Sequence, residues 1–248
     1  MNLKLKSKVL LIAVLISSLL TSTTNVATMN AVINEEVAEF SDYDSDETDS
    51  ESEQSLNEKL LQAIITHAPS SKIQRHLREG ARPNAVDFNG QTPLHIAAIA
   101  GNSSAINILL TQGASPKIVD HNRKSPLHYA AENNDLPIAN SLVSAFPEII
   151  DYQDINGDTA LHLFVSKNNL AAIYFLLTRG ANSNLANIDT ITPLHISTYN
   201  NDLLSTNALL IWHANPNVTD VNGIAPLYYA RLYNNSELVG LLTRYGAN

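Results

Sequence analysis

The sequence predicts an all-α repeat solenoid, because three features recur along the chain with one period of about 33 residues. The first is a short block in which Leu follows Pro or Ala and precedes His or Tyr. The second is a Gly-Ala or His-Ala pair, and the third is a single Asp or Asn. Units of this length cannot bury their own apolar faces, so they are expected to stack on one another. The marker residues are His95, His128, His162, His195 and Tyr228; Gly80, Gly113, Gly180, His213 and Gly246; and Asp87, Asp120, Asp154, Asn187 and Asp220.

The segment from Thr92 to Gly113 predicts the content of one unit. Thr92 is a favourable N-cap, and Pro93 fits the first position of a helix because its missing N–H has no partner there. Gly101 is expected to end this helix in a left-handed conformation, and a second helix should close at Gly113. The residues that follow are rich in turn formers and predict a projecting loop. Neither helix is long enough to be stable alone, so packing between units must hold both.

The T-P-L-H blocks, the period and the Gly-Ala closures make residues 56–248 resemble the ankyrin repeat family. The resemblance implies an ankyrin stack of about six helix-turn-helix units with projecting hairpin-like loops, and binding of other proteins on the concave face. It also implies a structural role for the repeat histidines, as hydrogen-bonding groups around the helix start that link neighbouring units. The expected units are 56–88, 89–121, 122–155, 156–188, 189–221 and 222–248, with the outer two acting as caps.

Two departures from the repeat lead to specific expectations. Phe146-Pro147 replaces Gly-Ala in the third unit, and one residue is inserted before Asp154, so this loop should have a different shape. Four units carry Asn where Gly101 ends the first helix, and Asn is the best non-glycine residue for a left-handed cap. These residues are Asn134, Asn168, Asn201 and Asn234.

Residues 1–28 have the layout of a secretory signal peptide. Lys4, Lys6 and Lys8 form a basic start, and the apolar run Val9 to Leu20 follows, broken only by two serines. A membrane span needs about 20 apolar residues, so the alternative of an uncleaved anchor is less favoured. The cleavage point is not defined by the residues around Ala27 and Ala31. The chain is therefore expected to be secreted or periplasmic, with a membrane-anchored form as the alternative.

Residues 29–55 predict a disordered acidic linker, since ten acidic residues fall between Glu35 and Glu53. An acidic recognition or phosphorylation segment is the alternative, with Ser45, Ser50 and Ser52 among the carboxylates. From Gln54 onward the chain has 14 acidic and 12 basic residues, so its body is nearly neutral. A nearly neutral body with no basic stripe argues against nucleic-acid binding.

The sequence offers no support for an enzyme or a cofactor. It has no Cys, which excludes disulfides and thiolate chemistry, and no phosphate loop or nucleophile motif. Units in such a stack lie roughly 10 Å apart, too far for the repeat histidines to share one metal ion. The Asp and Asn-Gly pairs in the loops lack the closing Glu of a calcium-binding EF-hand and are explained by turn formation. We therefore expect no enzymatic activity, no metal and no cofactor.

A protein-binding surface is the function that remains. The resemblance places the partner against the loop tips and the exposed side of each first helix, with tyrosines as favoured anchors. Tyr129 and Tyr199 are expected to face solvent, so that alanine at either position should weaken binding without unfolding the stack. The expected partner-binding residues are Phe88, Ile96, Ile99, Tyr129, Glu132, Leu163, Lys167, Tyr199, Tyr229 and Tyr233.

Two functional hypotheses follow from this sequence. The first is an exported, non-catalytic protein-interaction module that is a candidate secreted effector, expected to be a monomer and to bind an unidentified protein. The second is a scaffold tethered to a membrane by an uncleaved N-terminal anchor. The mature N-terminus distinguishes the two.

Overall fold

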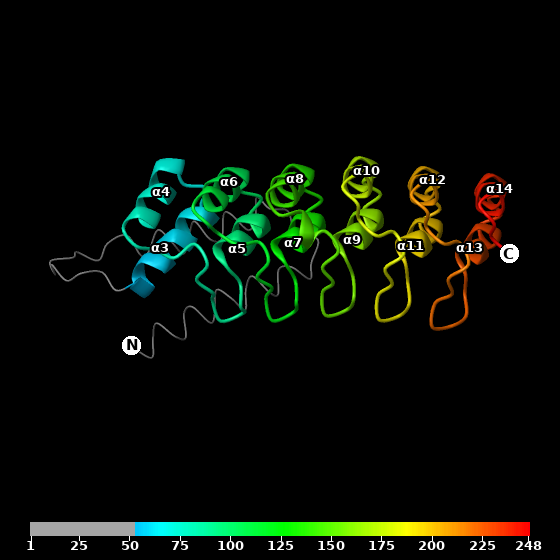
Figure 1. Cartoon of the computed structure of the whole chain (residues 1–248), viewed down its shortest axis with the longest axis horizontal. Coiled ribbons are helices and arrows are strands. Elements are labelled where there is room, and N and C mark those ends of the chain that lie inside the picture. Colours follow the sequence, from blue (N-terminus) through cyan, green and yellow to red (C-terminus); the bar gives the residue numbers. More distant parts are fainter. Residues whose placement is uncertain (1–52) are drawn as a thin grey trace. The chain divides into compact units, whose positions relative to one another are not determined.

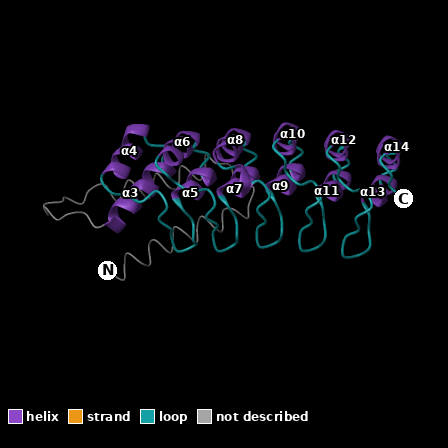
Figure 2. Ribbon diagram, in the orientation of Figure 1, coloured by secondary structure: helices purple, strands orange, loops and turns teal. Residues whose placement is uncertain are grey.

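The computed structural model describes residues 53–248 of the chain (Figure 1). The predicted signal peptide and nearly all of the predicted linker lie outside the described residues. Within 53–248 the secondary structure is helical, with twelve α-helices, one short 3-10 helix and no strand (Figure 2). None of these helices is long and apolar enough to cross a membrane.

The helices form consecutive pairs, and each pair is one unit of the predicted repeat. The first helices of the units pack side by side in one row, and the second helices pack in another (Figure 1). Long loops connect the units and project beyond the row of first helices (Figure 2). The pairs are α3 (Glu53–Ile65) with α4 (Ser70–Arg78), α5 (Pro93–Ile99) with α6 (Ser103–Thr111), α7 (Pro126–Glu132) with α8 (Leu136–Ala145), α9 (Ala160–Ser166) with α10 (Leu170–Thr178), α11 (Pro193–Tyr199) with α12 (Leu203–Ile211), and α13 (Pro226–Leu232) with α14 (Ser236–Arg244).

The core runs without interruption through the row of first helices. Leu94 and its counterparts in the later units are buried, and Ala97 and Ala98 let neighbouring helices approach closely. In the fifth unit Ser197 and Thr198 replace the two alanines and are also fully buried. Their hydroxyl groups donate to the carbonyl of Leu194 over 3.1 and 3.0 Å, which satisfies them inside the helix.

The helix ends follow the chemistry expected from the sequence. Pro occupies the first helical position of four first helices, and Thr or Ser precedes the helix in four units. Gly101 has φ of 66°, and the four asparagines at the equivalent position have φ between 53° and 58°. The expectation of left-handed caps at these positions is confirmed.

The third unit closes differently from the others, as its sequence predicts. Phe146 follows α8 with φ of −142°, so the chain is extended where other units turn through a left-handed residue. The 3-10 helix η1 (Pro147–Ile149) then returns the chain to the core, where Ile149 is fully buried. Pro147 fits the first position of this short helix because it needs no hydrogen-bond partner for its nitrogen.

The first unit begins earlier than the sequence boundary at residue 56. Helix α3 starts at Glu53, and the Glu53 carboxylate pairs with the guanidinium group of Arg82. The side chain of Asn57 accepts a hydrogen bond from the backbone N–H of Arg82 over 2.7 Å. These contacts between the start of the helix and the first loop explain why helical structure extends into the acidic tract.

Candidate protein-interaction surface

Near the tip of each loop, an Asp or Asn side chain closes a tight turn. In the first of these loops, Asp87 Oδ1 accepts hydrogen bonds from the backbone N–H groups of Asn89 and Gln91, both over 2.8 Å. The Asp or Asn at the same position in the following four loops accepts the same pair of bonds. The recurrence of these residues therefore reflects loop folding. Across residues 53–248, no group of three or more His, Asp or Glu side chains is placed to hold a metal ion.

Backbone hydrogen bonds join each loop to the next at equivalent positions. These bonds fix the spacing of the loops, so the loop tips form one ordered edge. The bonds run from the N–H of His121 to the carbonyl of Asn89 (2.9 Å), from Ile155 to Asn122 (2.9 Å), from Ile188 to Asn156 (2.9 Å) and from Val221 to Asp189 (3.1 Å).

The side chains at these loop tips are exposed and mostly apolar. We name Phe88, His121, Ile155, Ile188 and Val221 the loop-tip row; its four apolar members have exposed fractions between 55% and 65%. An apolar side chain at such exposure leaves more than half of its surface in water. A regular row of them marks a surface that can lose its water to a partner.

The four repeat histidines bridge neighbouring units behind this edge. In the second unit, His95 Nδ1 accepts a hydrogen bond from the backbone N–H of Thr92 over 3.0 Å. The ring proton is therefore on Nε2, which donates to the carbonyl of Lys124 in the next loop over 3.0 Å. His128, His162 and His195 make the same two contacts with their own N-cap residues and with Asp158, Ile191 and Ile224.

Burial keeps these imidazoles neutral. Desolvation lowers the pKa of His95 to about 4, against the opposing effects of its backbone hydrogen bond and of Asp120. Desolvation also lowers the pKa values of His128, His162 and His195. A neutral ring is what the geometry requires, because a protonated Nδ1 cannot accept the bond from the N-cap N–H.

Tyr129 is not on the surface, and the expectation that it faces solvent is wrong. Its ring is buried, its hydroxyl donates to Asp120 Oδ2 over 2.5 Å, and it accepts a bond from Gln91 Nε2 over 2.9 Å. The ion pair between Lys124 and Glu132 covers it, with Lys124 Nζ 5.5 Å from the ring centroid. Burial and the Asp120 carboxylate raise the pKa of the Tyr129 hydroxyl well above its usual value.

The other predicted surface residues divide into two groups. Lys167, Tyr199, Tyr233 and Phe88 are exposed. The remaining five are half-buried: Ile96, Ile99 and Leu163 pack against the core, Glu132 pairs with Lys124, and Tyr229 lies among other tyrosines.

Four tyrosines, three of them exposed and one half-buried, gather on the first helices at the C-terminal end of the row. The rings of Tyr199 and Tyr229 pack edge to face with centroids 5.4 Å apart, and those of Tyr228 and Tyr229 are 5.6 Å apart. Burial by these neighbours, together with nearby Asp220, raises the pKa of Tyr229. We name Tyr199, Tyr228, Tyr229 and Tyr233 the tyrosine cluster.

Sequence reasoning missed Tyr228 as a surface residue. It occupies the position of the repeat histidine, whose ring the next loop covers in the four preceding units. Within residues 53–248 no loop covers the Tyr228 ring, which is 50% exposed. The signal was present in the sequence, because Ala225-Pro226-Leu227-Tyr228 is the last copy of the block and lacks both the hydroxyl N-cap and the histidine.

Comparison with known proteins agrees with this architecture. A family profile described as ankyrin repeats (3 copies) matches residues 60–151, and one described as ankyrin repeats (many copies) matches residues 127–177. The chain belongs to the ankyrin repeat family. No curated protein sequence matches it.

Two solved ankyrin repeat domains illustrate the likeness. The ankyrin repeat domain of Bcl-3, described as a unique member of the IkappaB protein family, is 27% identical with a TM-score of 0.69. That match covers 77% of this chain and 86% of the Bcl-3 domain. An ankyrin repeat domain from Acinetobacter baumannii AYE is also 27% identical, with a TM-score of 0.71, and the match covers 76% of this chain and 98% of that domain. Ankyrin repeats are in general protein-protein interaction modules.

Proposed function

We propose that this ankyrin repeat protein is a non-catalytic binding module that holds a partner protein against the tyrosine cluster and the loop-tip row. The observation that carries the proposal is the cluster itself, in which Tyr199, Tyr228 and Tyr233 have exposed fractions between 42% and 59%. Tyr is enriched among the residues that dominate binding energy, since it combines a large apolar ring with one polar group.

The hydrogen bonds behind these side chains favour binding. Hydrogen bonds between loops, together with the histidine bridges, hold the loop tips in place before a partner arrives. A surface that is already ordered loses little conformational entropy on binding. The uncharged character of the tyrosine cluster suits an apolar or neutral patch on the partner better than a charged segment.

We further propose that the chain is exported and acts outside the compartment where it is made, as a secreted effector. This rests on the basic start and the apolar run from Val9 to Leu20. Mass spectrometry of the mature N-terminus, on soluble and membrane fractions separately, tests it. A new N-terminus between about residues 21 and 32 in the soluble fraction is the expected result, and an intact Met1 in the membrane fraction contradicts it.

The binding surface is tested by measuring a captured partner's affinity for single variants by calorimetry. Tyr199→Ala and Tyr229→Ala should each weaken binding by more than about 1 kcal/mol, because each removes a packed aromatic ring from the surface. Tyr245→Ala is the matched control, since Tyr245 is 40% exposed but follows α14, outside the cluster. Unchanged affinity for both cluster variants, with each still folded, would place the interface elsewhere.

A further inference from the structure

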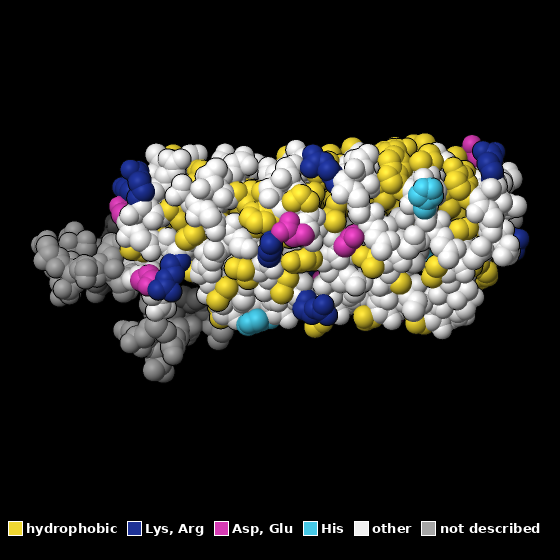
Figure 3. Space-filling model, in the orientation of Figure 1, with side chains coloured by type: hydrophobic (Ala, Val, Ile, Leu, Met, Phe, Trp, Pro, Cys, Tyr) yellow, Lys and Arg dark blue, Asp and Glu magenta, His cyan; other side chains and the backbone are white. Residues whose placement is uncertain are grey.

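The second helices present a patch that the repeat pattern does not explain. Two exposed positions, seven residues apart, recur on each second helix from α6 onward, and in the second, third and fourth units both are small, polar or Pro. In α12 both are large and apolar: Leu204 is 61% exposed and Ile211 is 45% exposed. Apolar side chains gather over α10 and α12 at the top of the molecule (Figure 3). The earlier pairs are Ser104 and Thr111, Pro137 and Ser144, and Ala171 and Thr178.

In α14 the same two positions carry opposite charges. Glu237 lies in the first turn of the helix and Arg244 in the last turn, both exposed. Seven residues of α-helix separate them by about 10 Å. Within the described residues neither side chain has an ion-pair partner of its own chain.

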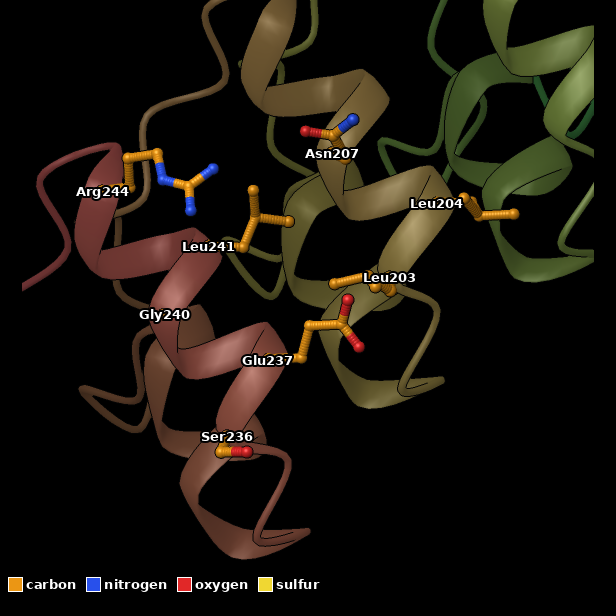
Figure 4. A pocket seen from close by; sticks show the side chains of 8 residues that line it. All are labelled: Leu203, Leu204, Asn207, Ser236, Glu237, Gly240, Leu241 and Arg244. Atoms are coloured by element: carbon orange, nitrogen blue, oxygen red, sulfur yellow. The ribbon is translucent and has the colours of Figure 1, made fainter.

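A shallow groove runs between these two helices. Leu203, Leu204 and Leu241 provide its apolar lining, and the side chains of Glu237 and Arg244 lie toward its two ends (Figure 4). The rest of the lining is Asn207, Ser236 and Gly240.

Gly240 leaves this groove open at its middle. A Cβ atom built on Gly240 meets no atom within 4 Å, and its φ is not positive, so neither packing nor backbone geometry requires Gly there. Gly in the interior of a helix lowers its stability relative to Ala. The absence of a side chain at Gly240 leaves room for a second backbone to approach the helix closely.

We propose that this face is the interface of a homodimer, formed by two copies of the chain related by a two-fold axis parallel to the stack. Such an axis sets α14 antiparallel to α14 of the second copy, so that Glu237 of each copy faces Arg244 of the other. It also sets α12 antiparallel to α12, so that Leu204 of each copy faces Ile211 of the other. An isologous interface requires this kind of self-complementary surface.

The positions of the residues favour a second copy over an unrelated partner. The midpoint between residues 204 and 211 falls beside Asn207, and the midpoint between 237 and 244 falls beside Gly240, one repeat period further along. One axis therefore brings together both the apolar pairs and the charged pairs, and it passes beside Asn207 and Gly240. The dimer leaves the tyrosine cluster and the loop-tip row free and presents them twice.

The competing explanation is that the two charges only stabilise α14. An acidic group near a helix N-terminus and a basic group near its C-terminus both interact favourably with the helix dipole. That explanation predicts a monomer and no coupling between Glu237 and Arg244 in different molecules.

Charge exchange distinguishes the two explanations. Sedimentation velocity of the whole chain at low ionic strength should show a concentration-dependent dimer. Glu237→Arg alone and Arg244→Glu alone should each weaken dimerisation by roughly tenfold or more, because each places like charges opposite one another. The double variant, Glu237→Arg with Arg244→Glu, should restore the dimer although it reverses the favourable dipole interactions.

Two further variants separate dimerisation from folding. Gly240→Ala should raise the melting temperature measured at a concentration where the chain is monomeric, because Ala favours helix, yet weaken the dimer by roughly tenfold. Leu204→Ser with Ile211→Thr, which copies the residues of α6, should abolish the dimer and leave the helix content unchanged. A monomer at all concentrations, or a dimer that none of these variants weakens, overturns the proposal.

Discussion

The hydroxyl of Tyr129 donates a hydrogen bond to the buried carboxylate of Asp120 over 2.5 Å. The same carboxylate, through its other oxygen, closes the loop turn that begins the unit. One side chain of a first helix is thereby joined to the loop that precedes it.

Tyr129→Phe should lower the free energy of unfolding by about 1–3 kcal/mol, since it leaves a buried carboxylate oxygen without a donor. Tyr199→Phe is the matched control, because the Tyr199 ring is exposed, and its effect should stay within about 0.5 kcal/mol. Urea unfolding measures both. Equal stability of the two variants would show that the Tyr129 bond contributes nothing.

Stability should fall as the pH is lowered from about 6.5 to 4. In this range the histidines of the unfolded chain take up protons, whereas the buried His95 stays neutral because its pKa is about 4. The unfolded state then binds more protons than the folded state, so acid favours unfolding, by up to about 3 kcal/mol for His95. The lowered pKa values of the other three repeat histidines add in the same direction.

The His95→Gln variant separates this effect from general acid denaturation. Gln does not titrate, so the variant should be less stable at neutral pH but lose less stability between pH 6.5 and 4. Thermal unfolding followed across this range by circular dichroism gives both slopes. Parallel slopes for the two proteins would mean that His95 titrates alike in the folded and unfolded states.

Gly157→Ala should be more damaging than Gly223→Ala. Both residues have positive φ, 79° and 75°, so Ala at either position costs about 1 kcal/mol in backbone strain. A Cβ at residue 157 also lies 2.9 Å from backbone atoms of Asn187 and Ile188 in the next loop, whereas at residue 223 nothing lies within 4 Å. The difference between the two melting temperatures isolates the contact between loops, and it should vanish if that contact is loose.

Asn102→Ala should destabilise the first two units by about 1–3 kcal/mol. The buried Asn102 side chain caps α6 at the N–H of Ala105 over 2.9 Å and donates to the carbonyl of Ile64 in the first unit, also over 2.9 Å. Asn235→Ala is the control, because Asn235 also caps its helix but donates to the side-chain oxygen of Asn201 near solvent. Hydrogen exchange of α3 and α4 should increase in the first variant only.

The repeat pattern was enough to predict the helix pairs, the caps and the altered third unit, because these depend on residues close in sequence. It was not enough to separate Tyr129 from Tyr229, which hold the same position in different units. The ion pair between Lys124 and Glu132 covers the Tyr129 ring. The Tyr229 ring instead packs against Tyr199 of the fifth unit. The exposure of a residue at this position depends on side chains in other units, and the pattern of a single repeat does not contain them.

The histidine bridges have a consequence for how the chain folds and changes over evolution. Each bridge spans 29 or 30 residues, and the helices of one unit pack mainly on each other and on those of the two neighbouring units. Contact order is therefore low, so folding can begin at any adjacent pair and spread outward in both directions. A whole unit can be gained or lost with its bridge intact, so the loop-tip row can become longer or shorter without a change in the units that remain.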